Sequence, residues 1–514
     1  MSAKDSFEEN EQRHPKATSP HHQLDWRWVA RYRELSAYDT YWWWAQAGPF
    51  TEEEEQQQWE QLFALNLDEM TKERLGTIIA QSRERELKAA ITERREPRLH
   101  YPALTFEELQ SRIAALLQLD MEISQHEPNA IVRRLYHEAI AEEICDLRLI
   151  ESTYERDNAR FWELTRWLFP EPTAEEMNYA LSRLSHLLKR GLAQPETVEA
   201  SQQFTHFLHE RLQLSLDLSF DEQEVQEPQN DVPQLSSSVK QKVSPQAARR
   251  FFETILREHG YEDWQVAIDP NAHSARVEQG LRKLFLTDAT LSVDRLSHYV
   301  SHELAGHVAR CIAGECSKLG LLGIHTRNSL ETEEGLAMYY DRQTETLHGQ
   351  KYDDTVVWSG TLATGLASGV VTSPQTFLSL YTFFEAFYLL YQLLRRPNAN
   401  VQKAQERASR HALAMCLRTY RGVPNLEQAG VCFTKDALYL RGLWKIERAL
   451  AQDETVLDRL AVGVVALEQL PDLQELGIVT SPQPLRKLTN DPNLDAYIRS
   501  FEEQQREKYP ARQE

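Results

Sequence analysis

The sequence contains few cysteines, and their arrangement suggests neither a disulfide framework nor a cysteine metal site. Five cysteines are scattered over 514 residues, and no CxxC pair occurs. Secreted proteins with structural disulfides usually carry closely spaced cysteines in even numbers, so this usage is typical of a reducing compartment. The first 23 residues are polar and lack the apolar segment of a signal peptide. We therefore expect a cytoplasmic protein.

Positive charge is also scarce, with 57 Lys+Arg against 78 Asp+Glu and a net charge of −21. Such an acidic surface repels phosphate backbones and anionic lipids, so we expect no nucleic-acid partner. The longest apolar stretch, 370–394, includes Pro374, Gln375, Glu385 and Gln392. These residues favour a buried core helix over a membrane span, so we expect no membrane partner either.

Strand-like patterns are rare, whereas helical periodicity runs through most of the chain. From residue 24 to about 220, apolar residues recur every three or four positions. Alternating segments occur at 264–268, 275–277 and 283–286, directly before a helix that we expect over 293–313. The predicted fold is mostly α, with a small antiparallel β-sheet preceding the helix that carries the candidate active site.

A chain of this length exceeds one ordinary core, so we expect two or three packed units. Residues 221–243 are polar, contain Pro and Ser and lack periodicity, which indicates a linker or long surface loop. Ser244 and Pro245 then favour a new helix start. The predicted organisation is a disordered tail (1–23), a helical N-terminal region (24–220), the linker (221–243), a catalytic core (244–470) and a polar C-terminal extension (471–514).

One histidine-rich segment, residues 298–307, carries the candidate chemistry. A zinc hydrolase needs three protein ligands, an open coordination position and a carboxylate beside it. Two histidines on a helix usually bind one metal ion when they are four residues apart. At that spacing their directions around the helix axis differ by only ~40°, whereas at five residues they differ by ~140°. His302 and His307 are five apart. We therefore expect a local bulge between them, which Gly306 would allow.

Two carboxylates complete this prediction. Glu303, next to His302, is the candidate general base that takes a proton from water. Glu334 is the candidate third ligand, because Thr332 can cap a new helix that returns beside the first.

Two other histidines compete as ligands when the residues are read by spacing alone. His298 and His302 have the regular four-residue spacing, and His325 lies in an expected loop. Histidines that only pack between helices are a further alternative, because an HExxxH pattern is short.

Four sequence blocks resemble one family. They are HELAGH (302–307), TEEGLAMYY (332–340), RTYRG (418–422) and FTKDALYL (433–440). Their order and intervals, over roughly 99–450, resemble the bacterial proteins named for a QEGLA motif and the animal microtubule-associated tyrosine carboxypeptidases. The resemblance implies an HExxxH zinc metallopeptidase with a mostly helical catalytic domain.

Carried over to this chain, the resemblance implies Zn2+ as cofactor, with His302, His307 and Glu334 as ligands and Glu303 as base. It does not favour His298 or His325 as ligands, and Glu333 stands where the motif has Gln. The animal members remove a C-terminal residue, tyrosine in the best-known case, from tubulin. A peptide or protein C-terminus is therefore the expected substrate.

A carboxypeptidase must hold a free carboxylate, which Arg and Lys do best. Arg421 or Lys435 is the candidate for this contact, and Tyr439 is the candidate donor to the developing oxyanion. The alternative is structural, with Gly422 in a turn and Lys435 paired with Asp436.

The function predicted from the sequence is thus a zinc-dependent peptidase, in particular a carboxypeptidase. A helical interaction scaffold with a structural or vestigial metal site is the alternative from another class. A scaffold has no need of a carboxylate beside the first ligand, so Glu303 favours the enzyme. A zinc hydrolase acting on other bonds would share the same metal chemistry.

Overall fold

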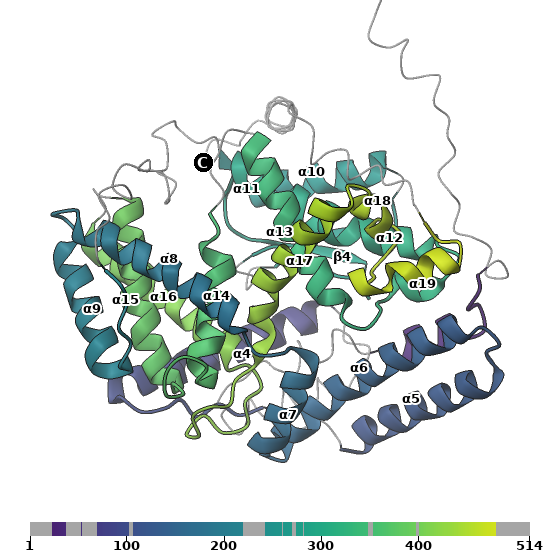
Figure 1. Cartoon of the computed structure of the whole chain (residues 1–514), viewed down its shortest axis with the longest axis horizontal. Coiled ribbons are helices and arrows are strands. Elements are labelled where there is room, and N and C mark those ends of the chain that lie inside the picture. The colour runs from purple at the N-terminus through teal and green to yellow at the C-terminus, as the bar shows by residue number, and fades with distance from the viewer. Residues whose placement is uncertain are drawn as a thin grey trace, which may run out of the picture.

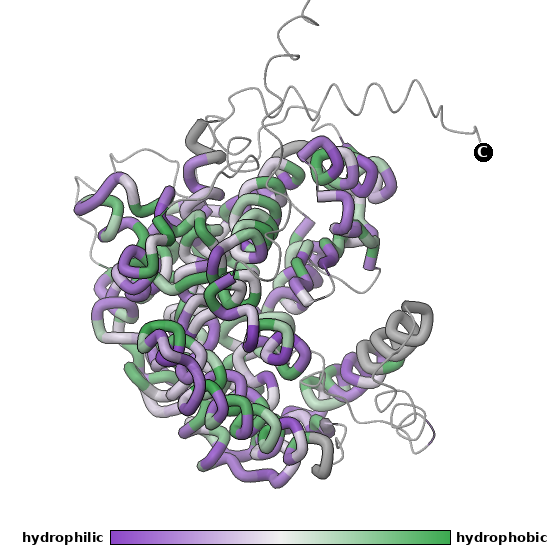
Figure 2. The backbone as a smooth tube through the Cα atoms, turned by 90° about the vertical axis from the view of Figure 1, so that its right-hand side faces the viewer, coloured by the Kyte–Doolittle hydropathy of each residue, from purple (hydrophilic) through white to green (hydrophobic). Residues whose placement is uncertain are grey.

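The computed structural model of this chain is mostly helical (Figure 1). The residues that it describes are 23–36, 53, 69–101, 106–218, 242–259, 261–269, 274–280, 282–347, 353–396 and 400–479. Most of the predicted tail, linker and C-terminal extension lies outside these residues, and the predicted domain bounds stay predictions. Along many of the helices, hydrophobic and hydrophilic residues occur in the same turns (Figure 2), as expected when one face of a helix is buried.

Helices fill the first part of the described chain, and side-chain caps mark where several of them begin. The Asn129 side chain accepts hydrogen bonds from two backbone N–H groups at the start of α6. Thr173 and Glu176 form a capping box at the start of α8. The helices of this part are α1 (Val29–Leu35), α4 (Glu69–Glu93), α5 (Phe106–His126), α6 (Ala130–Tyr154), α7 (Asn158–Leu168), α8 (Ala174–Leu192) and α9 (Val198–Leu212).

Of the strands in the described residues, β2, β3 and β4 lie within one residue of the three predicted segments, and β1 and β5 are additional. β2 (Gln265–Asp269), β4 (Lys283–Thr287) and β3 (Arg276–Glu278) form one sheet in that order, and β1 (Lys242–Val243) pairs antiparallel with β5 (Leu291–Ser292). The antiparallel prediction holds for β1–β5 and β3–β4, but β2 and β4 are parallel. β2 and β3 lie at the two edges of this sheet, and β4 lies between them. The chain therefore runs from one edge to the other and then turns back into the middle, which leaves β4 antiparallel to β3 and parallel to β2.

A helix of three parts follows the sheet, as expected, and leads into the second helical part. The elements are α10 (Pro245–Glu258) before the strands, then α11 (Val293–Tyr299), η3 (Val300–Val308), α12 (Ala309–Glu315), η4 (Gly320–Gly323), α13 (Ser329–Leu347), α14 (Thr355–Ser368), α15 (Phe377–Arg395), α16 (Val401–Thr419), η5 (Thr434–Ala437), α17 (Leu438–Gln452), α18 (Val456–Leu460), η6 (Leu467–Gln469) and α19 (Leu470–Glu475). The Ser244 hydroxyl caps α10, as its sequence predicts.

Helix α15 is long and apolar enough to cross a membrane by composition alone. However, 61% of its apolar window is buried against the rest of the protein, where it packs on α16 and α9. The helix begins at Phe377, after the Thr376 cap, so the first residues of the predicted stretch 370–394 precede it. This burial agrees with the predicted core helix.

The main hydrophobic core joins helices from both sides of the predicted linker. A Cβ added to Gly365 on α14 would lie 2.3 Å from Sδ of Met177 on α8. A Cβ added to Gly191 on α8 would lie 2.8 Å from a methyl carbon of Leu390 on α15. The N-terminal helices therefore share side-chain packing with the helices that follow the strands.

Candidate metal centre

The helix that carries His302 and His307 is π-helical over η3, Val300–Val308. A π-helix forms hydrogen bonds between residues five apart, so residues at that spacing approach one face. The imidazole centroids of His302 and His307 are 5.2 Å apart. The distortion expected from the five-residue spacing is thus present, and it extends through a whole π-helical segment.

Gly306 lies where η3 meets α13. A Cβ added to Gly306 would be 2.8 Å from the Cβ of Ala337, which is closer than side chains approach one another. Its backbone lies outside the left-handed region. The glycine is therefore needed because it lets the two helices approach closely. From the sequence we expected it to allow the bulge through its backbone freedom.

Helix α13 brings Glu334 to the two histidines. His302 Nε2 lies 4.0 Å from Glu334 Oε2. His302, His307 and Glu334 each offer a ligand atom, and these atoms all lie within 4.8 Å of one another. Two imidazoles and one carboxylate form the donor set of many catalytic zinc sites. These residues therefore fit a divalent metal of the zinc type.

Each histidine is oriented by a carboxylate from α13. His302 Nδ1 donates to Asp341 Oδ2 at 2.9 Å, and His307 Nδ1 donates to Glu333 Oε1 at 2.9 Å. These contacts leave the Nε2 atom of each ring free for a metal. A Gln at position 333, as in the QEGLA motif, could also accept from His307.

The electrostatics of the cluster also suit a cation. Burial lowers the pKa of His302, but the carboxylates of Asp341, Glu303 and Glu334 together outweigh burial and raise this pKa to about 9. Burial raises the pKa of Asp341, but His298 and His302 outweigh burial and lower it below its ordinary value. The excess of carboxylates around these histidines would favour a bound divalent cation.

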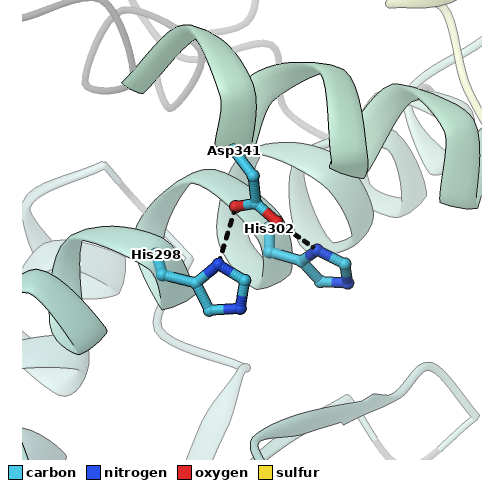
Figure 3. A group of neighbouring side chains, drawn as sticks. All are labelled: His298, His302 and Asp341. Carbon is cyan, nitrogen blue, oxygen red and sulfur yellow. Dashed lines mark hydrogen bonds and ion pairs between the residues drawn. The ribbon is translucent and has the colours of Figure 1, made fainter. Parts of the chain in front are cut away.

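The role of Asp341 was not predicted from the sequence, although its spacing from Glu334 could have indicated it. It follows Glu334 by seven residues, two helical turns on the same face of α13. The same carboxylate binds His298, whose Nδ1 lies 3.0 Å from Asp341 Oδ1 (Figure 3). His298, His302 and Asp341 are also close enough to hold a metal. Both Nδ1 atoms are used in hydrogen bonds to Asp341, so we interpret this trio as a hydrogen-bonded group.

His325 lies elsewhere, in a buried polar cluster that includes Tyr32 of α1. Its Nε2 is 2.8 Å from the Tyr32 hydroxyl and 3.6 Å from Glu143 Oε2. Its side chain is 2% exposed. The structure therefore separates His325 from the three candidate ligands, whereas it keeps Glu303, which is buried on η3, next to His302.

The candidate substrate residues converge on Glu334. Lys435 Nζ is 3.8 Å from Glu334 Oε1, and the Tyr439 hydroxyl donates to the same oxygen at 3.3 Å. Burial lowers the pKa of Lys435 to about 8, with Arg421 adding to the effect and Glu334 opposing it. Asp436 Oδ1 accepts from Arg418 at 2.9 Å.

Arg421 precedes a turn, as the structural alternative supposed. Gly422 has a φ of 72°, a value that favours glycine. Its N–H donates to the Tyr101 hydroxyl at 3.0 Å, and its carbonyl accepts from Thr153 at 2.7 Å. The turn thus holds Arg421 close enough to influence Lys435 and Tyr439 electrostatically.

Residues 387–505 match a family model described as microtubule-associated tyrosine carboxypeptidase. The matched segment includes Arg421, Lys435 and Tyr439 and begins after the three candidate metal ligands. It supports peptidase activity of the carboxypeptidase type. The match covers less than half of the chain, so it is a likeness to that family, and the resemblance to the bacterial QEGLA proteins stays a prediction. No curated protein matches this chain.

Proposed function

We propose that this protein is a zinc-dependent carboxypeptidase, with His302, His307 and Glu334 as ligands and Glu303 as general base. The observation that carries the proposal is the π-helical register of η3, which gives His302 and His307 a common face opposite Glu334. Asp341 and Glu333 add the outer carboxylates that orient metal-binding histidines. The family match at 387–505 supports the carboxypeptidase reaction.

A zinc ion in this site would polarise the scissile carbonyl and lower the pKa of a water molecule. Glu303 takes a proton from the attacking water, whose oxygen forms a bond to the carbonyl carbon. The carbon–nitrogen bond then breaks, and Glu303 returns that proton to the leaving amine. The products are a shortened peptide and a free amino acid.

The distance between Lys435 and Glu334 supports cleavage next to a C-terminus. Adjacent Cα atoms are ~3.8 Å apart, so a carboxylate one residue beyond the scissile bond lies close to the metal ligands. Lys435 Nζ is 3.8 Å from Glu334 Oε1, which suits this short reach. In our proposal, Lys435 with Arg421 holds the terminal carboxylate.

Tyr439 is the proposed donor to the oxyanion that develops on the scissile carbonyl. Its hydroxyl is already directed at Glu334 Oε1. The Arg418 guanidinium carbon lies 5.5 Å from the centroid of the Tyr439 ring. This contact with a cation would help to hold the ring in place.

Metal content and peptide cleavage test this proposal together. We expect about one zinc per chain by mass spectrometry, with weaker binding in His307→Ala and in Glu334→Ala. Peptides with free C-termini should lose their last residue, whereas amidated peptides should not. Glu303→Gln is the matched control, which should keep zinc and lose about 10²–10⁴-fold in rate.

Two results would contradict the proposal. A wild-type protein that takes up no zinc would favour the helical scaffold. Equal cleavage of free and amidated peptides would exclude a carboxypeptidase. We further propose a cytoplasmic location, for which the cysteine usage and acidic surface are the support.

A further inference from the structure

Asp341 holds two imidazoles side by side, and the proposed chemistry uses one of them. Its Oδ1 accepts from His298 and its Oδ2 accepts from His302, at 3.0 and 2.9 Å. The ring centroids are 5.4 Å apart and the ring planes differ by 32°. Figure 3 shows the second nitrogen of both rings on the side away from Asp341. The same carboxylate therefore gives His298 and His302 a similar orientation.

His298 is the more open of the two. Its side chain is 25% exposed, against 13% for His302 and 2% for Asp341. Within the described part of the chain, no hydrogen bond or ion pair involves His298 Nε2. In a neutral imidazole, donation from Nδ1 to a buried carboxylate fixes the tautomer and leaves Nε2 as a hydrogen-bond acceptor.

Asp341 does not need His298 to satisfy its oxygens. The Ser301 hydroxyl donates to Oδ1 at 2.8 Å, and His302 donates to Oδ2. Burial of Asp341 is thus supported without a second imidazole. An oriented histidine with a partly exposed side chain suggests a role toward a bound molecule.

His298 neighbours the proposed ligand set without joining it. The group formed by His302, His307 and Glu334 excludes His298, and the group that includes His298 contains neither His307 nor Glu334. Lys435 and Tyr439 contact Glu334, so the carboxylate-binding residues gather at the other end of the cluster. A peptide bound between these ends would present its C-terminus to Lys435 and its preceding residue to His298.

We propose that His298 is a substrate-contacting residue, whose Nε2 accepts a hydrogen bond from the backbone N–H of the penultimate residue. This inference rests on the proposed carboxypeptidase function. The contact aligns the peptide so that the carbonyl of the penultimate residue faces Glu303. Because the hydrogen bond comes from a backbone N–H, it can form with any penultimate residue except proline, which has no N–H.

The sharpest test combines a variant with a modified peptide. His298→Asn keeps an amide N–H near Asp341 and removes the group at Nε2, so zinc content should equal that of the wild type. We expect kcat/KM to fall about 10-fold or more, as for the loss of a positioned hydrogen bond. An N-methyl group on the penultimate amide should slow the wild type by a similar factor and should slow His298→Asn far less.

Three results would overturn the role of His298. These are a kcat/KM in His298→Asn within twofold of the wild type, an equal N-methyl penalty in both proteins, and a loss of zinc from His298→Asn. The last result would instead make His298 part of the metal site.

Wild type and zinc-loaded Glu303→Gln separate this proposal from the function on which it rests. If wild type cleaves peptides with free C-termini but His298→Asn behaves identically, the His298 contact alone is wrong. If wild type cleaves none, calorimetric binding of the same peptides to Glu303→Gln, with and without His298→Asn, decides the contact. Weaker binding in the double variant supports the contact in a protein that binds peptides without cleaving them. Equal binding, or none, overturns it.

Discussion

The two ends of the proposed site are built differently. The metal end comes from two neighbouring segments, η3 and α13, and each histidine there has a carboxylate partner. The carboxylate-binding end comes from the turn before Gly422 and from η5 and α17, which meet Glu334 through tertiary packing. The π-helical geometry of η3 and its packing against α13 thus form the first end, whereas contacts between segments about 100 residues apart in the sequence assemble the second.

Helix α13 joins the two ends through small residues on its faces. Ala337 touches Gly306 on η3, and Gly335 touches Gly442 on α17. A Cβ added to Gly335 would lie 2.2 Å from the backbone carbonyl carbon of Gly442, a separation that no side chain tolerates. The distance between the two ends therefore depends on how closely three helices pack.

The largest expected effect comes from Gly442→Ala, which should disturb both ends together. The new Cβ would lie 2.2 Å from the carbonyl oxygen of Glu331 and would force α17 away from α13. We expect a loss of about 3 kcal/mol or more in stability, because backbone atoms cannot move aside. Thermal unfolding and zinc content measure the change. Ala451→Ser, at an exposed position of the same helix, is the control, and equal Tm values would refute the packing argument.

The second prediction separates the ends. Lys435→Ala should reduce kcat/KM by about 10²-fold, because a charge-assisted contact to the substrate carboxylate is lost. Zinc content should stay at the wild-type value, since Lys435 is not among the proposed ligands. Steady-state kinetics with metal analysis tests this. Unchanged kinetics would mean that Lys435 has only a structural role. Loss of zinc would show that Lys435 also supports the metal end of the site.

The third prediction concerns the metal end alone. Asp341→Asn should weaken zinc binding about 10–100-fold, the usual cost of losing an outer carboxylate. An Asn side chain has one acceptor oxygen, so it can serve His302 or His298 but not both. Competition with a chelator of known affinity measures the change. Wild-type affinity would mean that Asp341 does not orient the ligand.

The smallest effect is expected for Glu333→Gln. The amide oxygen of Gln can still accept from His307 Nδ1, and the motif that this chain resembles has Gln at the same position. We expect less than a tenfold loss of zinc affinity in the same chelator assay. A larger loss of zinc affinity than in Asp341→Asn would mean that Glu333 contributes more to zinc binding than Asp341 does.

Much of the local structure was predictable from the sequence. The three strand segments lie within one residue of their predicted positions, and the five-residue histidine spacing required a distortion that η3 provides. The parallel pairing of β2 and β4 was not predictable, because strand periodicity indicates which residues form a strand and not which neighbour it chooses. The core shared by α8, α14 and α15 was not predictable either, since composition indicates a linker but not which helices pack together across it.

The sequence by itself determined the helical class and the need for an irregular helix between His302 and His307, because periodicity and spacing act over a few residues. The candidate ligands and base rest on residue types and on the resemblance of the four sequence blocks, since spacing alone left His298 and His325 open as ligands. The tertiary structure decided that Asp341 serves two histidines, that Glu333 holds His307, and that Lys435 and Tyr439 meet Glu334. Such contacts depend on how α13 packs against η3 and α17, and helix packing is set by the shape of both surfaces, which no single segment encodes.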